Sequence, residues 1–175
     1  MKLDIGCGQN KREGFTGVDS IKFPGVDIVH DIRTAWPWGD SSVDEVHCSH
    51  FVEHLTARER VFFCNELYRV LKPDASAQII TPHWASSRAY GDMTHQWPPV
   101  SEFWFYYLDK GWRKVNAPHD DSEFREDGYS CDFNVTWGYT PHPTLNVRNA
   151  EYQQHAMQFW LESRQDTVAN LKARK

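Results

Sequence analysis

Short apolar runs, each ending in a glycine, an acid or a histidine, divide the first part of the chain into strand-like segments. Residues 2–5 form one such run, which leads directly into Gly6 and Gly8. A buried parallel strand ends in this way where the backbone must approach a ligand closely. We expect two further short strands at residues 16–19 and 26–29, because both are apolar runs that end at an acidic turn.

The middle of the chain has the pattern of a strand, a helix and another strand. Residues 43–49 follow a cluster of turn residues and alternate as a strand does. A helix should begin just after Thr56, because Thr56 and Glu59 have the spacing of a capping box. Apolar residues then recur at helical spacing until Pro73, at Phe63, Leu67, Val70 and Leu71. Residues 78–81 predict a further strand.

The second half predicts two more helices and two more strands. The helices are expected at residues 102–110, with Gly111 as the stop signal, and at residues 151–161. The strands are expected at residues 133–137 and 167–172. Alternation of strands and helices indicates an α/β fold, whose ligands bind at the carboxyl ends of the parallel strands.

Composition narrows the function classes. With 175 residues, the chain is expected to form one domain over residues 1–175, and its net charge of −5 argues against a dedicated nucleic-acid binder. Four scattered cysteines lack a C-x-x-C pair, so we expect reduced thiols and a cytoplasmic location. No signal-like leader and no apolar run of about 20 residues is present, which predicts no membrane segment.

The glycine pair does not fit a dinucleotide. The dinucleotide fingerprint needs a third glycine three positions after Gly8, where a helix N-terminus meets the pyrophosphate, and Lys11 occupies that position. Residues 9–14 leave room for only a short turn of helix before the second strand. A nucleoside cofactor without a pyrophosphate fits this stretch better.

Five ordered blocks resemble the class I S-adenosylmethionine-dependent methyltransferases, particularly small members with a shortened first crossover. The blocks are LDIGCG at residues 3–8, GVD at 17–19, VDEV with SHFVEHL at 43–46 and 49–55, LYRVLKP at 67–73, and QIITP at 78–82. The resemblance covers roughly the first half of the chain. It implies a Rossmann-like sandwich with a mostly parallel seven-stranded sheet and an antiparallel last strand. It also implies S-adenosyl-L-methionine as cofactor and S-adenosyl-L-homocysteine as product.

The chain departs from this family at two points. Asn10 replaces a glycine that is common in the family, and no helix precedes the first strand. The cofactor site is therefore expected to be open, or to be closed by a later segment or by a second subunit, which keeps a homodimer among the expectations.

The resemblance assigns the cofactor contacts residue by residue. Asp19 would accept both ribose hydroxyls, and Asp31 would lie near the adenine amino group with Ile32 beside the ring; each aspartate has the alternative of an ordinary turn residue. Asp4 would organise the glycine loop or hold the methionine amino group through water, since a carboxylate in a strand is costly without a partner. The full expected set is Asp4, Gly6, Cys7, Gly8, Asp19, Ser20, Asp31, Ile32, Ser49 and His50.

Three residues are candidates for catalysis: His95, His50 and Asp92. Residues 86–99 are expected to form a flap over the acceptor, in which Asp92 orients His95 and His95 accepts a proton, because imidazole titrates near neutral pH. The alternative is that His95 only pins the flap. His54 is expected to pack structurally below the site, with catalysis as the alternative. Metal ligands could in principle come from His50, His54, His83, His95 and Asp92, but no H-E-x-x-H or His-Cys spacing is present, so no metal site is expected.

These assignments predict methyl transfer to a small-molecule or sugar-like acceptor. One alternative is nucleic-acid methylation, which is disfavoured because residues 48–51 read CSHF, where amino-methyltransferases of DNA resemble one another in an Asp/Asn-Pro-Pro-Tyr/Phe segment. The other alternative is an idle cofactor-binding or scaffold domain.

Overall fold

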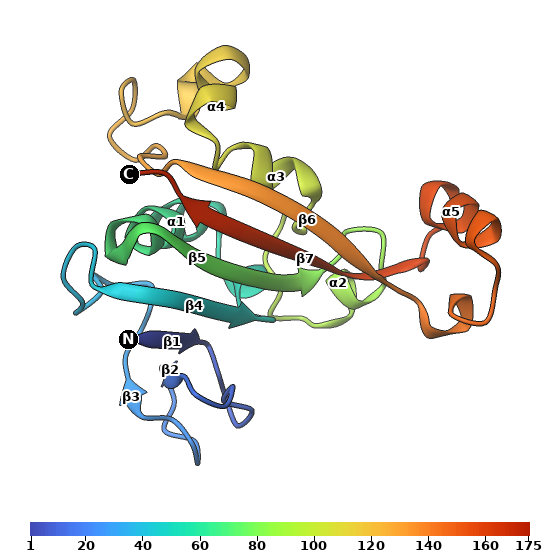
Figure 1. The fold of residues 1–175 in the computed structure, drawn as a ribbon, viewed down its shortest axis with the longest axis horizontal. Helices are drawn as coiled ribbons and strands as arrows, with labels where there is room; N and C mark the ends of the chain where they lie inside the picture. Colours follow the sequence, from blue (N-terminus) through green and yellow to red (C-terminus); the bar gives the residue numbers. More distant parts are fainter.

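The computed structural model describes residues 1–175 and contains one seven-stranded sheet (Figure 1). Its strand order is β3-β2-β1-β4-β5-β7-β6. The strands are β1 (Lys2–Ile5), β2 (Thr16–Asp19), β3 (Ile28–Val29), β4 (Val43–Ser49), β5 (Leu71–Pro82), β6 (Phe133–Pro141) and β7 (Arg164–Ala173). Strands β1 to β5 pair in parallel, whereas β7 is antiparallel to β5 and to β6. This topology confirms the predicted mostly parallel sheet with an antiparallel last strand.

Five α-helices and three 3-10 turns accompany the sheet. They are α1 (Ala57–Val70), α2 (Arg88–Gly91), α3 (Glu102–Tyr106), α4 (Lys110–Asn116) and α5 (Ala150–Phe159), with η1 (Val52–His54), η2 (Pro118–Asp120) and η3 (Pro143–Leu145). The capping box before α1 is confirmed: the Thr56 hydroxyl accepts from the Glu59 N–H, and the Glu59 carboxylate accepts from the Thr56 N–H. The predicted apolar stripe of α1 is buried in the core.

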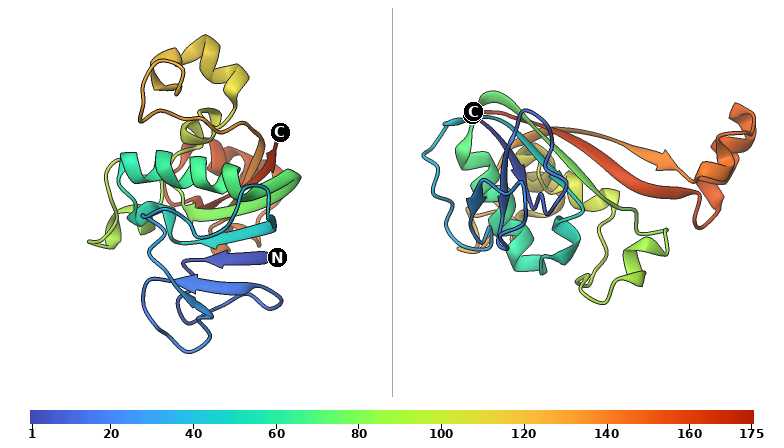
Figure 2. Two further views of the ribbon diagram at one scale, coloured as in Figure 1. Left: turned by 90° about the vertical axis from the view of Figure 1, so that its left-hand side faces the viewer. Right: turned by 90° about the horizontal axis from the view of Figure 1, so that it is seen from below.

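The core lies between one face of the sheet and the helices α1 and α3 (Figure 2). Loops without helices connect β1, β2, β3 and β4. Because side chains alternate along a strand, β4 turns Val46 and Cys48 towards α1 and turns Glu45 and His47 towards the opposite face. That face is polar, with a 2.6 Å ion pair between Lys2 and Glu45. Polar side chains there let one face of a parallel sheet remain without a helical layer.

Residues 142–163, between β6 and β7, project from the body of the molecule as an arm that carries η3 and α5 (Figures 1 and 2). None of the helices is both long enough and apolar enough to cross a membrane. All four cysteines are buried and unpaired, at Cys7, Cys48, Cys64 and Cys131.

Several predicted boundaries were wrong. The helix expected at residues 102–110 divides into α3 and α4, and Gly111 lies inside α4. The reason is a new N-cap: the Asp109 carboxylate accepts from the Trp112 N–H at 2.8 Å and starts a second helix. Residues 9–14 form turns and no helix. Strand β3 contains two of the four residues expected at 26–29, and β5, β6 and β7 are all longer than the strands expected there.

Candidate active site

The loop after β1 is shaped by two left-handed glycines and one aspartate. Gly6 has φ +67° and Gly8 has φ +50°, backbone angles that favour glycine. A Cβ on Gly6 would also lie 2.6 Å from the ring of Phe51. Asp19, at the end of β2, accepts from the Gly8 N–H at 2.9 Å and from the Ile21 N–H at 2.9 Å. The carboxylate therefore holds the glycine loop at the carboxyl end of β2.

A cavity of about 200 Å³ opens beside this loop, at the carboxyl ends of β1, β2 and β3. Five of the expected cofactor residues line it: Gly6, Asp19, Ser20, Asp31 and Ile32. The rest of the wall consists of His30, Arg33, Phe51, His54 and Leu55. Sequence reasoning did not name these five additional wall residues as cofactor contacts.

Asp31 is held by a neighbour that the sequence did not single out. Arg33 donates to both oxygens of Asp31 at 2.9 Å, and this hydrogen bonding lowers the pKa of the Asp31 carboxyl below its usual range. A contact between Asp31 and an adenine amino group must therefore share the carboxylate with Arg33. The adjacent His30 has a buried Nε2 without a hydrogen-bond partner, which makes it a further polar contact in the wall.

The other five expected cofactor residues do not line this cavity: Asp4, Cys7, Gly8, Ser49 and His50. The Asp4 carboxylate is buried, accepts from the Arg12 N–H at 2.7 Å and lies 2.7 Å from the His47 Nδ1. Oδ2 thus anchors the loop after β1 and Oδ1 joins β1 to β4, which favours the loop-organising alternative for Asp4. The Cys7 thiol is buried, and burial, followed by the charge of Asp4, raises its pKa.

A second, larger cavity of about 680 Å³ lies beyond the carboxyl ends of β4 and β5. All three candidate catalytic residues line it, together with residues from η1 and from the segment around α2; the wall consists of His50, Glu53, His54, Pro82, Arg88, Gly91, Asp92, Met93 and His95. His54 lines both cavities, so the two spaces adjoin at its ring. The expectation that His54 packs away from the site was wrong.

Hydrogen bonds determine which ring nitrogen of His54 carries the proton. The Thr94 hydroxyl donates to Asp92 Oδ1 at 2.7 Å and also lies 2.9 Å from His54 Nδ1. Because the hydroxyl proton is directed at the carboxylate, the oxygen of Thr94 accepts the Nδ1–H of His54. The Nε2 of neutral His54 is then left with a free lone pair.

His95 is held in a similar way by a different partner. Its Nδ1 lies 3.2 Å from the backbone oxygen of Ala89, which can only accept, so Nδ1 carries the proton and Nε2 keeps its lone pair. The rings of His54 and His95 meet edge to face, with centroids 4.8 Å apart. The Asp92 carboxylate bonds Thr94, and through it His54, where a bond to the His95 ring was expected; Asp92 contacts His95 through its backbone oxygen, which accepts from the His95 N–H at 3.2 Å. The hydrogen bonds that Asp92 accepts from Thr94 lower the pKa of the Asp92 carboxyl group.

Glu53 and His50 form the charged floor of this cavity. Glu53 is only 4% exposed; its Oε2 accepts from the Thr81 hydroxyl at 3.2 Å, and its Oε1 has no hydrogen-bond partner. His50 Nδ1 lies 3.3 Å from Glu53 Oε1, and this carboxylate raises the pKa of His50 above its usual value. At the rim, Arg88 pairs with Asp166 at 2.8 Å. Sequence reasoning missed Glu53 and Arg88, although Glu53 stands directly before His54.

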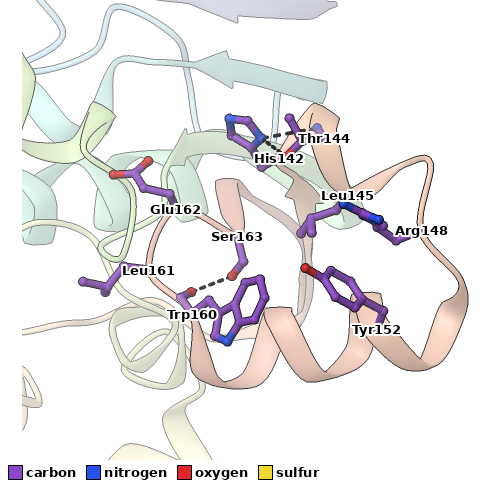
Figure 3. A pocket seen from close by; sticks show the side chains of 9 residues that line it. All are labelled: His142, Thr144, Leu145, Arg148, Tyr152, Trp160, Leu161, Glu162 and Ser163. Carbon is purple, nitrogen blue, oxygen red and sulfur yellow. Dashed lines mark hydrogen bonds between the residues drawn. The ribbon is translucent and has the colours of Figure 1, made fainter.

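A cavity of about 250 Å³ in the arm is separate from these two (Figure 3). It lies between α5 and the turn that leads into β7, and the Ser163 hydroxyl closes that turn by donating to the Trp160 oxygen at 2.7 Å. None of the expected site residues lines it.

Comparison with known proteins agrees with this architecture. A family model described as a methyltransferase domain matches residues 10–79. No curated protein sequence matches the chain. An S-adenosylmethionine-dependent methyltransferase from Archaeoglobus fulgidus superposes with a TM-score of 0.68 at 21% identity, covering 98% of this chain and 85% of that one.

Two further solved structures show the same fold. An S-adenosylmethionine-dependent methyltransferase from Methanosarcina mazei has a TM-score of 0.57 at 15% identity and covers 99% of this chain and 92% of its own. The [4+2]-cyclase SpnF has a TM-score of 0.55 at 14% identity and covers 99% of this chain and 74% of its own. A cyclase with this fold shows that the fold alone does not set the reaction. The methyltransferase-domain match over residues 10–79 and the shared fold make the chain similar to class I S-adenosylmethionine-dependent methyltransferases.

Proposed function

We propose that the protein transfers the methyl group of S-adenosyl-L-methionine to a small-molecule or sugar-like acceptor and releases S-adenosyl-L-homocysteine. The observation that carries this proposal is the pair of adjoining cavities that share His54. One cavity has the glycine loop and the acids suited to a nucleoside, and the other has polar groups suited to an acceptor. A methyl group passing between them would travel beside His54.

In this proposal Asp19 binds the ribose. A carboxylate has about four acceptor positions, and the N–H groups of Gly8 and Ile21 take two of them. The remaining positions are free for two hydroxyl donors. Asp31, Ile32 and Ser20 would contact the adenosine, whereas Gly8, Asp4 and Cys7 would act through the shape of the loop.

The acceptor would occupy the larger cavity, where one arginine, three histidines and two acids offer hydrogen bonds to a polar molecule. The sulfonium is an activated donor, so the protein must chiefly align the acceptor atom in line with the methyl group. For an acceptor that must lose a proton, His95 is the assigned base, because its Nε2 lone pair is free. His50 and Asp92 are positioning residues in this scheme.

Two measurements test the proposal in sequence. Isothermal titration with S-adenosyl-L-homocysteine is expected to show one site per chain, and NAD is expected to show none. A screen of sugars, small hydroxylated molecules, amines and oligonucleotides, read out as S-adenosyl-L-homocysteine release, is then expected to find turnover among the small polar acceptors. Binding without turnover across the screen would leave an idle cofactor-binding domain, and turnover only on oligonucleotides would overturn the acceptor assignment.

A further inference from the structure

Glu53, His54 and His95 all line the larger cavity, and each offers one ligand atom within 4.8 Å of the others. Glu53 and His54 come from η1, and His95 comes from the loop after α2. We propose that these three side chains bind a divalent transition-metal ion that holds an oxygen of the methyl acceptor. Ion binding stands independently of the proposed function, and only the role of the ion in catalysis rests on it.

Both histidines are arranged as metal ligands. A histidine ligand uses one ring nitrogen for the ion and fixes its ring by donating the other N–H to an oxygen. His54 donates Nδ1–H to Thr94, and Thr94 is itself held by Asp92. His95 donates Nδ1–H to the Ala89 backbone oxygen. Each ring therefore has its outer partner in place and keeps an Nε2 lone pair for an ion.

The carboxylate supplies the second, independent observation. Glu53 is 4% exposed, and its Oε1 is buried without a hydrogen-bond partner. A buried carboxylate oxygen without a hydrogen-bond donor is costly, and a metal ion would remove this cost. The His50 ring lies 3.3 Å from Oε1 and pairs with it when protonated, so an ion would compete with His50 for this oxygen.

The ligand set also indicates the class of ion. Two imidazoles favour a transition metal over Mg²⁺ or Ca²⁺, and two histidines with one carboxylate leave coordination positions open for small ligands. Bonds to such an ion are about 2.0–2.2 Å, so the three side chains draw together slightly when it binds. All three ligands line the larger cavity, where an acceptor oxygen would enter.

Bound to the ion, an acceptor hydroxyl becomes a stronger acid, as water does on a zinc ion. The O–H proton leaves to solvent water through the open cavity, and an oxygen electron pair attacks the methyl carbon. The carbon–sulfur bond breaks, its electron pair stays on sulfur, and S-adenosyl-L-homocysteine leaves. The oxidation state of the ion does not change. When the ion is bound, His95 is a ligand of the ion and does not act as the general base.

Cobalt(II) binding to untagged, chelator-treated protein tests the site without any acceptor. We expect one Co²⁺ per chain, with visible absorption bands and an affinity reduced at least tenfold in His95→Ala, His54→Ala and Glu53→Gln. The matched control is His119→Ala, because His119 is exposed and pairs only with Asp120. That control should keep the parent affinity.

Titration of the same metal-free samples with S-adenosyl-L-homocysteine separates this proposal from the proposed function. Retained nucleoside binding in His95→Ala, together with lost Co²⁺ binding, supports the site and shows that this variant is folded. Absence of a Co²⁺ site in the parent protein, or equal Co²⁺ affinity in the parent and His95→Ala, would overturn the metal proposal. Nucleoside binding would remain unaffected by that outcome.

Discussion

Replacing Asp19 by alanine should weaken cofactor binding far more than it weakens the fold. Asp19 lies at the surface end of β2, and its two structural bonds are to the Gly8 and Ile21 N–H groups. Both donors lie in loops that remain open to water after the substitution. The fold therefore loses little, and the glycine loop loses its anchor.

The magnitude follows from the free acceptor positions on the carboxylate. A hydrogen bond to a charged group contributes about 1.5–3 kcal/mol, and two bonds to one carboxylate are not additive. A total loss of about 2–4 kcal/mol corresponds to a Kd for S-adenosyl-L-homocysteine roughly 30- to 700-fold higher, since 1.4 kcal/mol is a factor of ten. Asp19→Asn keeps the shape of the side chain but replaces one acceptor oxygen by a donor. Its Kd should lie between those of the parent and of Asp19→Ala.

The assay is calorimetric titration, with the melting temperature of the free protein as the measure of folding. Asp44→Ala is the matched control, because Asp44 lies at the amino end of β4, away from the carboxyl ends of the strands, where it pairs with Lys72 and with the N-terminal amine. We expect this control to bind as the parent does. An Asp19→Ala protein with parent-like affinity would refute the ribose assignment, and the site would then have to be sought elsewhere.

Three further predictions concern the loop and the supporting structure. Gly6→Ala should weaken nucleoside binding at least tenfold in the same titration and lower the melting temperature, because its Cβ would lie 2.6 Å from the Phe51 ring at a positive φ. Arg113→Ala should lower the free energy of unfolding by about 3–5 kcal/mol in denaturant titrations, because this fully buried arginine pairs with a buried carboxylate and donates to three backbone oxygens. Arg69 donates to Glu66 at 2.6 Å and lowers the pKa of that carboxyl below its usual 4.5. A carboxyl group whose pKa is lower in the folded state stabilises the fold at pH values above its unfolded-state pKa. This stabilisation is lost as the pH falls through the folded-state pKa. The denaturant midpoint of Glu66→Gln should therefore fall less steeply below about pH 4.5 than that of the parent.

The wall of the larger cavity shows where sequence reasoning fails. Asp92, His95 and His50 were expected in one site and do line one cavity. The partner of Asp92 was assigned wrongly, because a carboxylate can reach several neighbours in a flap and only the folded backbone selects Thr94. His54 and His95 were considered as metal ligands and set aside, and Glu53 was not considered, since His95 is about forty positions from Glu53 and His54 and no local spacing joins them.

The sequence by itself determined the features that depend on neighbouring residues. The capping box placed the start of α1, the apolar periodicity placed its buried face, and the glycine pair with the acids at strand ends marked the cavity at the carboxyl ends of β1, β2 and β3. Each of these features depends on a contact or a backbone angle of residues that lie only a few positions apart in the chain. Tertiary structure alone decided that loops replace helices on one face, that Asp109 divides a helix, and that His54 joins two cavities. Those outcomes depend on contacts between segments far apart in the chain, and such contacts form only when the sheet brings the ends of its strands together.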